Sequence, residues 1–334
     1  MKNKSISITE IARIAHVHPS TVSRALNGSP LVKEETRRWI SGIAQAHGYV
    51  PDAVAKSLLQ GKTSTLGVIV PEISNAFYAH IVDAMEQVMV QHGYSLILSG
   101  TRFDPESELR AIRTMIGKRV DALVVCAPSP QAEAQLLTLR RQLPVILCDP
   151  LQSCPALDCV SVDEHAGIGA AVAYLREKGH TRIGCIADRV TRHRMDIFIA
   201  AMKSAGLDPQ QQALCVSGDL SVNGGYAGLC ALAERGPLPT AIFAARDNIA
   251  VGAMRAAIEM GLDIPRQLSL VGYDGIRISD FLYKKLTTIR QPASDIGRNA
   301  AQLLLRRLES GEPGAAQDTA HIRLVPELIV RESA

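Results

Sequence analysis

The sequence has no long apolar run and few aromatic residues. Nearly half of its 334 residues are hydrophobic, yet Phe, Trp and Tyr together make up only 4%. A membrane-spanning helix needs about 20 consecutive apolar residues, and no stretch of the chain approaches that length. The first ten residues, MKNKSISITE, also lack the apolar core of a secretory signal. These absences predict a soluble protein that stays in the cytoplasm and has no membrane partner.

Motifs for metals, cofactors and catalysis are missing as well. Seven cysteines, an odd number, are scattered without CxxC spacing, so we expect reduced thiols that fill core spaces. GIGAAV at 167–172 lacks the third glycine of a dinucleotide fingerprint, and no GxxxxGK[ST] phosphate loop occurs. No nucleophile stands in an arrangement with a base. We therefore predict neither an enzyme nor a protein that carries a cofactor or metal.

Charge is unevenly distributed along the chain. The net charge is only +3, but residues 1–62 hold nine Lys and Arg against four Asp and Glu. The remaining residues are slightly acidic. A basic N-terminal segment on a near-neutral body is typical of a protein that binds nucleic acid. An ordinary solvated face would show the same charges, so this pattern needs a second signal.

That second signal is the stretch ITEIARIAHVHPSTVSRALNG, which predicts two short helices around a tight turn. The first helix, about Ile8–Ala15, has an apolar stripe, and Ser7 with Glu10 forms a capping box at its start. The second runs from about Pro19 to Asn27, since proline suits a first helical turn. A third helix is expected over about 33–47, with Trp39 helping to close a small three-helix core.

Two interpretations of this pair of helices remain open at this point. A corner between two helices occurs in many helical domains. Alternatively, the pair forms a helix-turn-helix unit whose second helix enters the DNA major groove. The second helix leaves a short, hydroxyl-rich outer face with one arginine, which suits contacts to base edges and phosphates. The residues of that face are Ser20, Thr21, Ser23 and Arg24.

Beyond residue 65 the pattern changes to short apolar strands that alternate with helices, which predicts parallel sheets. The strands are too many for one compact sheet, so two lobes are expected, with a break near 158–163. The expected strands are 66–71, 95–100, 121–127, 144–149, 160–163, 182–187, 213–216, 241–245 and 268–274. The expected helices are 76–92, 105–118, 131–143, 164–178, 195–205, 223–235, 249–260 and 294–310.

The segments TVSRALNG and ITEIARIAHV together resemble the N-terminal headpiece of the lactose-repressor family of bacterial transcription regulators. The similarity continues through VKEETR at 32–37 and GYVP at 48–51. It extends to LTTIRQP at 286–292 and PELIVRES at 326–333, so it covers the whole chain. The resemblance implies an all-α helix-turn-helix headpiece plus an α/β two-lobed effector domain with parallel sheets, like the periplasmic sugar-binding proteins.

The resemblance also implies boundaries. The headpiece is expected at 1–50, a hinge helix and linker at 51–62, and an effector-binding and dimerisation domain at 63–334. Its first lobe should hold about 63–159 and 292–322, and its second lobe about 160–291 and 323–334. One final strand, IRLVPELIVRES, is expected to cross back to the second lobe. Where the family usually has glycine in the headpiece turn, this chain has His16, which tolerates a left-handed backbone better than most residues.

On the DNA side, the resemblance implies a near-palindromic operator bound by a homodimer, since one headpiece covers one half-site. Whether dimers pair into a tetramer stays open. Leu58 matches the apolar side chain that wedges into the minor groove, and an ordinary linker helix is the alternative for that segment. Pro19, Ser20 and Arg24 are expected to read the major groove. The full set of expected DNA-binding residues is Ser7, His18, Pro19, Ser20, Thr21, Ser23, Arg24, Asn27, Ala55 and Leu58.

Ligands of α/β proteins bind beyond the carboxyl ends of strands. Family positions transferred one at a time imply eight effector-binding residues: Phe77, Tyr78, Asp149, Arg192, Arg194, Leu220, Arg246 and Asp274. Arg246 stands where the family usually has asparagine, and its bidentate fork suits carboxylate or phosphate. If Arg192 and Arg194 converge with Arg246, the effector is anionic, such as a sugar acid or sugar phosphate.

Alternatives to that effector hypothesis remain. The arginines could pair with Glu72, Asp149 or Asp188 or point to solvent, and the effector would then be a neutral sugar or a nucleobase-like metabolite. Two other protein classes are disfavoured. A transport receptor should carry a signal peptide and no headpiece, and an enzyme needs chemistry that the sequence does not show. The sequence therefore predicts a DNA-binding transcription regulator, expected to be a repressor, under the control of a small molecule.

Overall fold

The computed structural model describes residues 6–49, 61–152, 154–209, 214–217, 219, 221–310 and 318–334. The chain forms two compact units, Met1–Thr63 and Ser64–Ala334, here named the headpiece unit and the two-lobed unit. No helix in the described ranges has both the length and the hydropathy of a membrane span. The expected hinge helix with Ala55 and Leu58 lies outside the described residues, as does Leu220.

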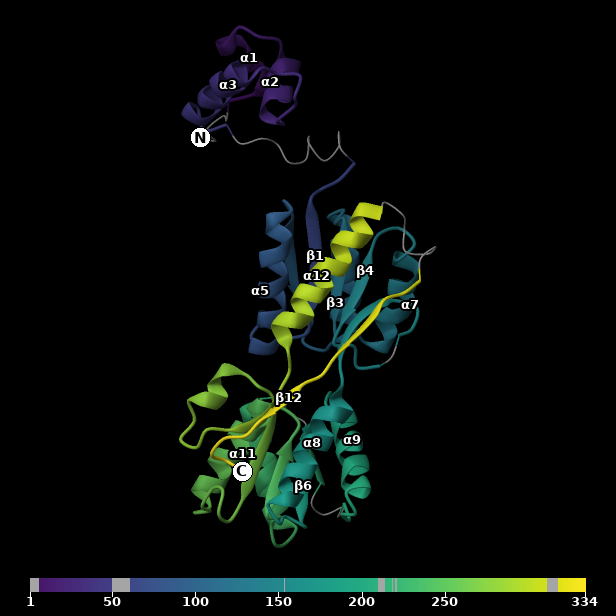
Figure 1. Ribbon diagram of the computed structural model, residues 1–334, viewed down its shortest axis with the longest axis vertical. Coiled ribbons are helices and arrows are strands. Elements are labelled where there is room, and N and C mark those ends of the chain that lie inside the picture. The colour runs from purple at the N-terminus through teal and green to yellow at the C-terminus, as the bar shows by residue number, and fades with distance from the viewer. Residues whose placement is uncertain are drawn as a thin grey trace. The chain divides into compact units, whose positions relative to one another are not determined.

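The described residues of the headpiece unit contain three helices (Figure 1): α1 (Ile8–Ala15), α2 (Pro19–Leu26) and α3 (Glu34–Ala46). The predicted capping box is present, because the Ser7 side chain accepts a hydrogen bond from the Glu10 N–H while the Glu10 carboxylate accepts one from the Ser7 N–H. His16 ends α1 in the left-handed conformation with φ 52°. A three-residue turn then leads to α2, where Pro19 occupies the first turn as predicted.

The core of the headpiece unit is built from the apolar stripes of all three helices. Ile11, Val22 and Ile40 are fully buried in it. The expectation that Trp39 closes this core is wrong, because 59% of its surface is exposed. Successive residues of a helix point about 100° apart, so the stripe that buries Ile40 turns its neighbour Trp39 toward solvent.

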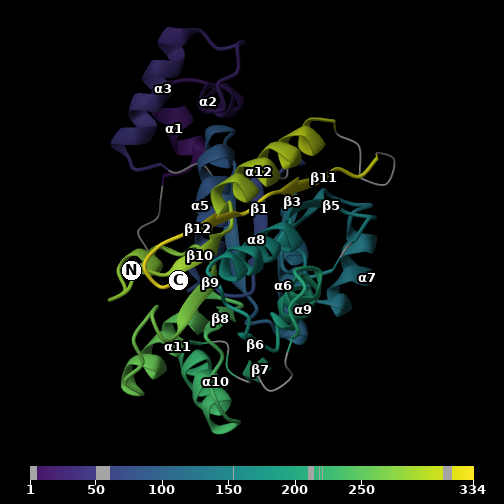
Figure 2. The same ribbon diagram turned by 60° about the horizontal axis from the view of Figure 1, so that its bottom comes forward.

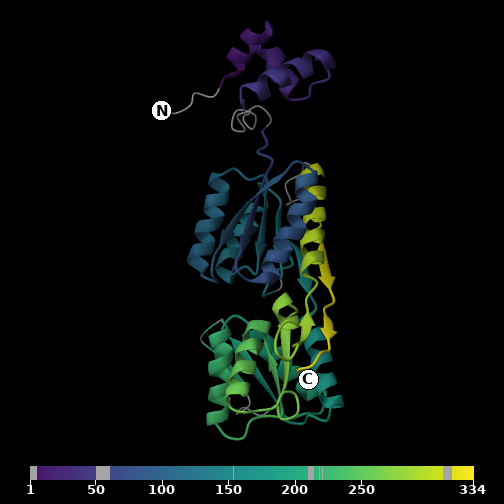
Figure 3. The ribbon, with the colours of Figure 1, turned by 90° about the vertical axis from the view of Figure 1, so that its left-hand side faces the viewer.

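The two-lobed unit contains two parallel sheets with helices on both faces, one in each lobe (Figure 3). Among the described residues, the first sheet has six strands in the order β11-β5-β4-β3-β1-β2. Its strands are β1 (Thr65–Val70), β2 (Ser95–Gly100), β3 (Ala122–Cys126), β4 (Val145–Cys148), β5 (Asp158–Val162) and β11 (His321–Leu324). Its helices are α5 (Ala76–Gln91), α6 (Pro105–Gly117), α7 (Pro130–Leu139) and α12 (Ala293–Ser310).

The second sheet has six strands in the order β12-β10-β9-β8-β6-β7 among the described residues, and only β12 runs antiparallel, along β10. Its strands are β6 (Ile183–Asp188), β7 (Leu214–Ser217), β8 (Ala241–Ala244), β9 (Ser269–Asp274), β10 (Thr287–Arg290) and β12 (Glu327–Ile329). Its helices are α8 (Glu164–Glu177), α9 (Arg192–Ser204), α10 (Val222–Glu234), α11 (Asp247–Glu259) and the short 3-10 turn η2 (Arg277–Asp280).

The chain passes between the lobes after β5, after β10 and between β11 and β12. Figure 2 shows β11 and β12 as one continuous ribbon. The expected single final strand is therefore two strands: β11 pairs with β5 in the first sheet and β12 with β10 in the second. Pro326 lies at the break and has no N–H to donate to a ladder.

The first passage also falls later than expected. Residues from 160 onward were assigned to the second lobe, but β5 pairs with β4 in the first sheet. The physical reason is packing, because Val160 and Val162 belong to the core between that sheet and helices α5 and α12.

Close packing of α10 on α11 fixes the start of α11, which borders the space between the lobes. A Cβ atom at Gly252 would lie 1.8 Å from the Val222 carbonyl oxygen. Glycine therefore allows the two helix backbones to touch, and this contact holds the residues at the N-terminus of α11 in place.

Candidate functional site

Helix α2 presents a polar surface in the headpiece unit. Ser20 and Arg24 are exposed on it, and Pro19, Thr21 and Ser23 are half-buried beside them. The buried stripe of Val22 and Ala25 holds the opposite face against α1 and α3. The helix therefore offers hydroxyl groups and one guanidinium outward from a rigid support.

Three of the expected DNA-binding residues have roles within the headpiece itself. Ser7 caps α1. His18 caps α2, since its Nδ1 accepts from the Ser20 N–H at 3.3 Å and lies 2.8 Å from the Ser20 hydroxyl. Asn27 donates from Nδ2 to the Ser23 carbonyl oxygen at 2.9 Å. The contacts of His18 and Asn27 lie at the start and the end of α2, the helix that carries Arg24.

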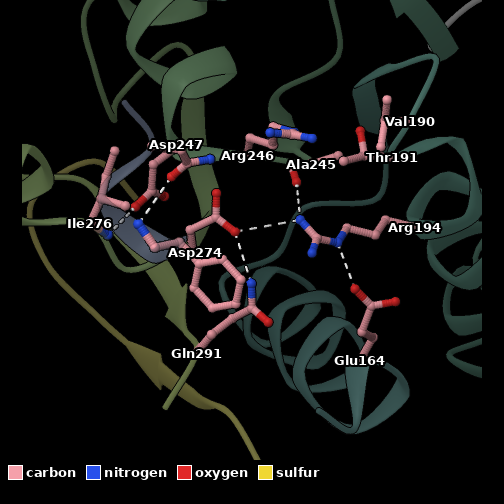
Figure 4. Close-up of polar contacts among 12 residues, drawn as sticks. Glu164, Val190, Thr191, Arg194, Ala245, Arg246, Asp247, Asp274, Ile276 and Gln291 are labelled. Atoms are coloured by element: carbon pink, nitrogen blue, oxygen red, sulfur yellow. Dashed lines mark hydrogen bonds and ion pairs between the residues drawn. The ribbon is translucent and has the colours of Figure 1, made fainter. Parts of the chain in front are cut away.

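In the two-lobed unit, charged side chains gather where the strands of both sheets end toward each other. Arg194, in the first turn of α9, lies at the centre of the cluster in Figure 4. Its Nε donates to Glu164 at 2.7 Å, and its Nη1 donates to the Ala245 carbonyl oxygen at 2.9 Å. Nη1 also lies 3.5 Å from a carboxylate oxygen of Asp274, and the guanidinium stacks over the Tyr273 ring at 3.9 Å.

These contacts shift the protonation equilibria of the pair. Burial would lower the pKa of Arg194, but Glu164 and the nearby acids raise it well above its usual value. Burial would likewise raise the pKa of Glu164, yet Arg194 and His193 lower it to about 2. Both groups are therefore charged at every physiological pH.

Arg246, just before α11, is the second buried arginine. Its Nη1 donates to Glu72 at 3.1 Å. Its Nε lies 2.9 Å from an Asp188 carboxylate oxygen, although the N–H is not aligned for a hydrogen bond. Arg246 therefore pairs with two of the acids, Glu72 and Asp188, that the sequence offered as alternative partners of the arginines.

Asp149 follows β4 and is buried without a counter-ion in contact. No hydrogen bond or ion pair among the described residues reaches its carboxylate. Burial raises its pKa to about 7, and the attraction of Arg194 offsets only part of that effect. Burial, with the charge of Asp149 second, also raises the pKa of Tyr78 well above its usual value. Tyr78 lies edge-on to Phe77, with ring centroids 5.1 Å apart.

Asp274 ends β9 with a φ of 118°, a strained conformation for a residue with a side chain. Its Oδ1 accepts a hydrogen bond from Gln291 Nε2 at 2.9 Å, while Gln291 Oε1 is buried without a hydrogen-bond partner among the described residues. Ala127 and Asp149, at the ends of β3 and β4, also have left-handed φ values of 46° and 48°. Strained strand ends therefore line the space between the lobes.

Two cavities flank this cluster. One of about 520 Å³ includes Phe77 and Asp274 in its lining, together with Gln291 and the start of α12. Another of about 430 Å³ is lined by Glu164, His193 and residues of β5 and β11. Both are in the size range of small-molecule sites.

The structure thus brings six of the eight expected effector residues into one region: Phe77, Tyr78, Asp149, Arg194, Arg246 and Asp274. Arg192 is exposed and does not join the two buried arginines, so the expected convergence of three arginines is not observed. Glu164 and Gln291 were missed as site residues. The only sequence signals for them were that Glu164 begins a helix and that Gln291 lies where the chain passes between the lobes.

Comparison with known proteins agrees with this architecture. Residues 7–52 match the family model for bacterial regulatory proteins of the lacI family, and residues 172–334 match a periplasmic binding protein-like domain. The ribose operon repressor of Escherichia coli (strain K12) is 32% identical over 333 residues, 98% of this chain and 99% of that protein.

Solved structures are similar over the same extent. The lac repressor dimer bound to operator and an anti-inducer has a TM-score of 0.89 at 25% identity and covers 99% of both chains. The complex of the transcriptional regulator CelR with cellobiose has a TM-score of 0.73 at 26% identity, over 98% of this chain and all of that one. The chain belongs to the lacI family of bacterial regulatory proteins: it is a DNA-binding transcriptional repressor with an effector-binding domain, and not an enzyme.

Proposed function

We propose that this repressor binds its operator through α2 and that a small molecule bound between the lobes controls the affinity. The observation that carries the proposal is the exposed face of α2, on which Ser20 and Arg24 stand free of the headpiece core. Arg24 is suited to a guanine edge or a phosphate. A protein that binds the bacterial chromosome works in the cytoplasm, and we include that location in the proposal.

We further propose a homodimer on a near-palindromic operator, because one headpiece reaches one half-site. The second lobe offers a surface for the contact. Phe281 and Tyr283, which follow η2, expose 69% and 82% of their surface. Their exposure supports the proposal, because neighbouring apolar side chains on a surface are often covered by a partner. The lac repressor in the similar structure is also a dimer.

The effector we propose is a neutral molecule rich in hydroxyl groups, with a nucleobase-like metabolite as the alternative. Both buried arginines already have carboxylate partners, so they offer little to an anion. Asp149, Asp274 and Gln291 instead present oxygen atoms that accept hydrogen bonds. Hydroxyl groups of a sugar would donate to them, and the similar regulator CelR is in complex with cellobiose.

A gel shift with the DNA upstream of the gene tests the regulator itself. We expect a specific complex for the full chain, and a weaker one for Leu58→Ala if the segment outside the described residues acts as the minor-groove wedge. If no specific complex forms with any fragment of this region, operator binding is refuted.

Titration calorimetry with neutral sugars, sugar acids and sugar phosphates tests the effector. We expect a neutral sugar to bind, with Asp149→Asn weakening its binding about tenfold through the loss of a carboxylate oxygen that accepts hydrogen bonds. Asp83→Asn removes an exposed carboxylate of α5 and should leave binding unchanged. Tight binding of an acid or phosphate alone would restore the anionic hypothesis in place of ours.

A further inference from the structure

Arg246 joins residues that are far apart in the sequence. Glu72 follows β1 in the first lobe, whereas Arg246 and Asp188 stand at strand ends of the second lobe. The Arg246–Glu72 hydrogen bond of 3.1 Å therefore crosses from one lobe to the other. The Phe103 ring, also from the first lobe, lies 5.2 Å from the guanidinium. Only 6% of the Arg246 side chain is exposed.

We infer that Glu72 and Asp188 are built-in counter-ions that make the cleft select against anionic effectors, and that Glu72 exerts this selection from the opposite lobe. The inference rests on the proposed function only in taking the space between the lobes as the effector site. It assigns to Glu72 two effects, since one ion pair both occupies Arg246 and ties the lobes together.

The two counter-ions differ in how firmly they are held. Asp188 is fully buried, and its Oδ1 accepts hydrogen bonds from the Val190 and Thr191 N–H groups, each at 2.8 Å. It cannot leave Arg246 without breaking the turn into α9. Glu72 retains 25% side-chain exposure, and its side-chain contact with Asn75 is long, at 3.4 Å. Glu72 is therefore the less firmly held partner, and its removal leaves Asp188 beside Arg246.

An anionic ligand would face two obstacles here. It would have to take Nη1 of Arg246 from Glu72, and it would leave the Glu72 carboxylate without its ion-pair partner. Breaking a buried ion pair in this way is strongly unfavourable. A neutral ligand avoids both costs, because it can accept or donate hydrogen bonds while the pair stays intact.

Inorganic sulfate is a probe for a freed Arg246 that needs no knowledge of the effector. We would titrate the full chain with sodium sulfate against sodium chloride of equal ionic strength, and follow binding by calorimetry and thermal stability. Wild-type protein should show no sulfate-specific response. Glu72→Gln should bind sulfate about tenfold more tightly or better, since a charge-assisted hydrogen bond becomes available. The double variant Glu72→Gln/Arg246→Gln should lose that gain.

Glu106→Gln is the matched control, because it removes an equal charge from an exposed position of the first lobe. It should respond to sulfate as the wild type does. Equal responses of wild type and Glu72→Gln, or a gain that survives in the double variant, would overturn the inference. Circular dichroism and the thermal unfolding midpoint of Glu72→Gln, measured in parallel, show whether the variant is folded. The sulfate measurement does not involve operator DNA, so this test stays separate from that of the repressor function.

Discussion

At the scale of single residues, Asp149 gives the clearest prediction. Its pKa is about 7 in the folded protein and near 3.8 when the side chain is exposed. Between these two pH values the folded state therefore binds a proton that the unfolded state has released. Its contribution to the free energy of unfolding is therefore full below pH 4 and lost as the pH rises to about 7. We expect Asp149→Asn to flatten this decline by on the order of 1–3 kcal/mol.

Denaturant unfolding of wild type and variant across that pH range measures the effect. Asp247 also has a pKa raised to about 7, with burial as the main cause, so part of the slope should remain in the variant. Glu164 contributes a slope of opposite sign at the acidic end of this range, because its pKa is lowered from 4.5 to about 2 in the folded protein. Identical slopes for wild type and Asp149→Asn would show that the carboxylate is not desolvated as described.

At this scale the sequence predicted which residues would lie together, because strand ends in an α/β protein converge wherever the strands do. Asp149, Arg246 and Asp274, which the family resemblance implies as effector-binding residues, do lie together at such strand ends in the structure. The sequence offered Glu72, Asp149 and Asp188 as possible partners of the arginines, but not which of them contacts Arg246, since Glu72 and Arg246 lie in different lobes. Arg192 failed to join Arg194 because residues two apart on a helix point in nearly opposite directions.

At the scale of elements, the spacing of apolar residues and the capping signals predicted the helices, and α1 begins at Ile8 and ends at Ala15 as expected. The final strand was less predictable, since only the pairing partners of β11 and β12 divide that apolar run between two sheets.

Ser7 permits a test of helix α1. Ser7→Ala should destabilise the headpiece by about 1 kcal/mol through loss of the cap. The sole tryptophan, Trp39, lies in α3, so its fluorescence reports unfolding of that unit alone.

Contact between α10 and α11 gives a second prediction for elements. Gly252→Ala would place a methyl group 1.8 Å from the Val222 carbonyl oxygen, so the helices must separate. We expect a loss of at least about 2 kcal/mol in the stability of the two-lobed unit, as for an overpacked core. Gly169→Ala in α8 meets no atom within 4 Å and should be neutral or slightly stabilising in the same thermal unfolding measurement. Equal behaviour of the two variants would refute the close contact.

At the scale of the whole molecule, the proposed dimer depends on the exposed aromatic residues after η2. Tyr283→Asp places a charge on that surface and should shift the sedimentation coefficient toward a monomer, with weaker operator binding as a consequence. Val330→Asp changes an apolar residue that is 51% exposed near the C-terminus and serves as the control. If Tyr283→Asp remains a dimer, the interface does not include this surface.

Control by an effector is also a property of the whole molecule, and it must be reciprocal. If a ligand changes operator affinity by some factor, the operator changes ligand affinity by the same factor. The Arg246–Glu72 hydrogen bond joins the two lobes in this structure. An effector that changes the angle between the lobes must therefore break or keep this contact.

The most direct test of the central claim is fluorescence anisotropy of an operator fragment titrated with the full chain and with Arg24→Ala. Wild-type protein should bind the fragment far more tightly than a scrambled sequence, and Arg24→Ala should lose about tenfold or more of that affinity. Binding that is equally tight to scrambled DNA, or unaffected by Arg24→Ala, would contradict the assignment of sequence recognition to α2.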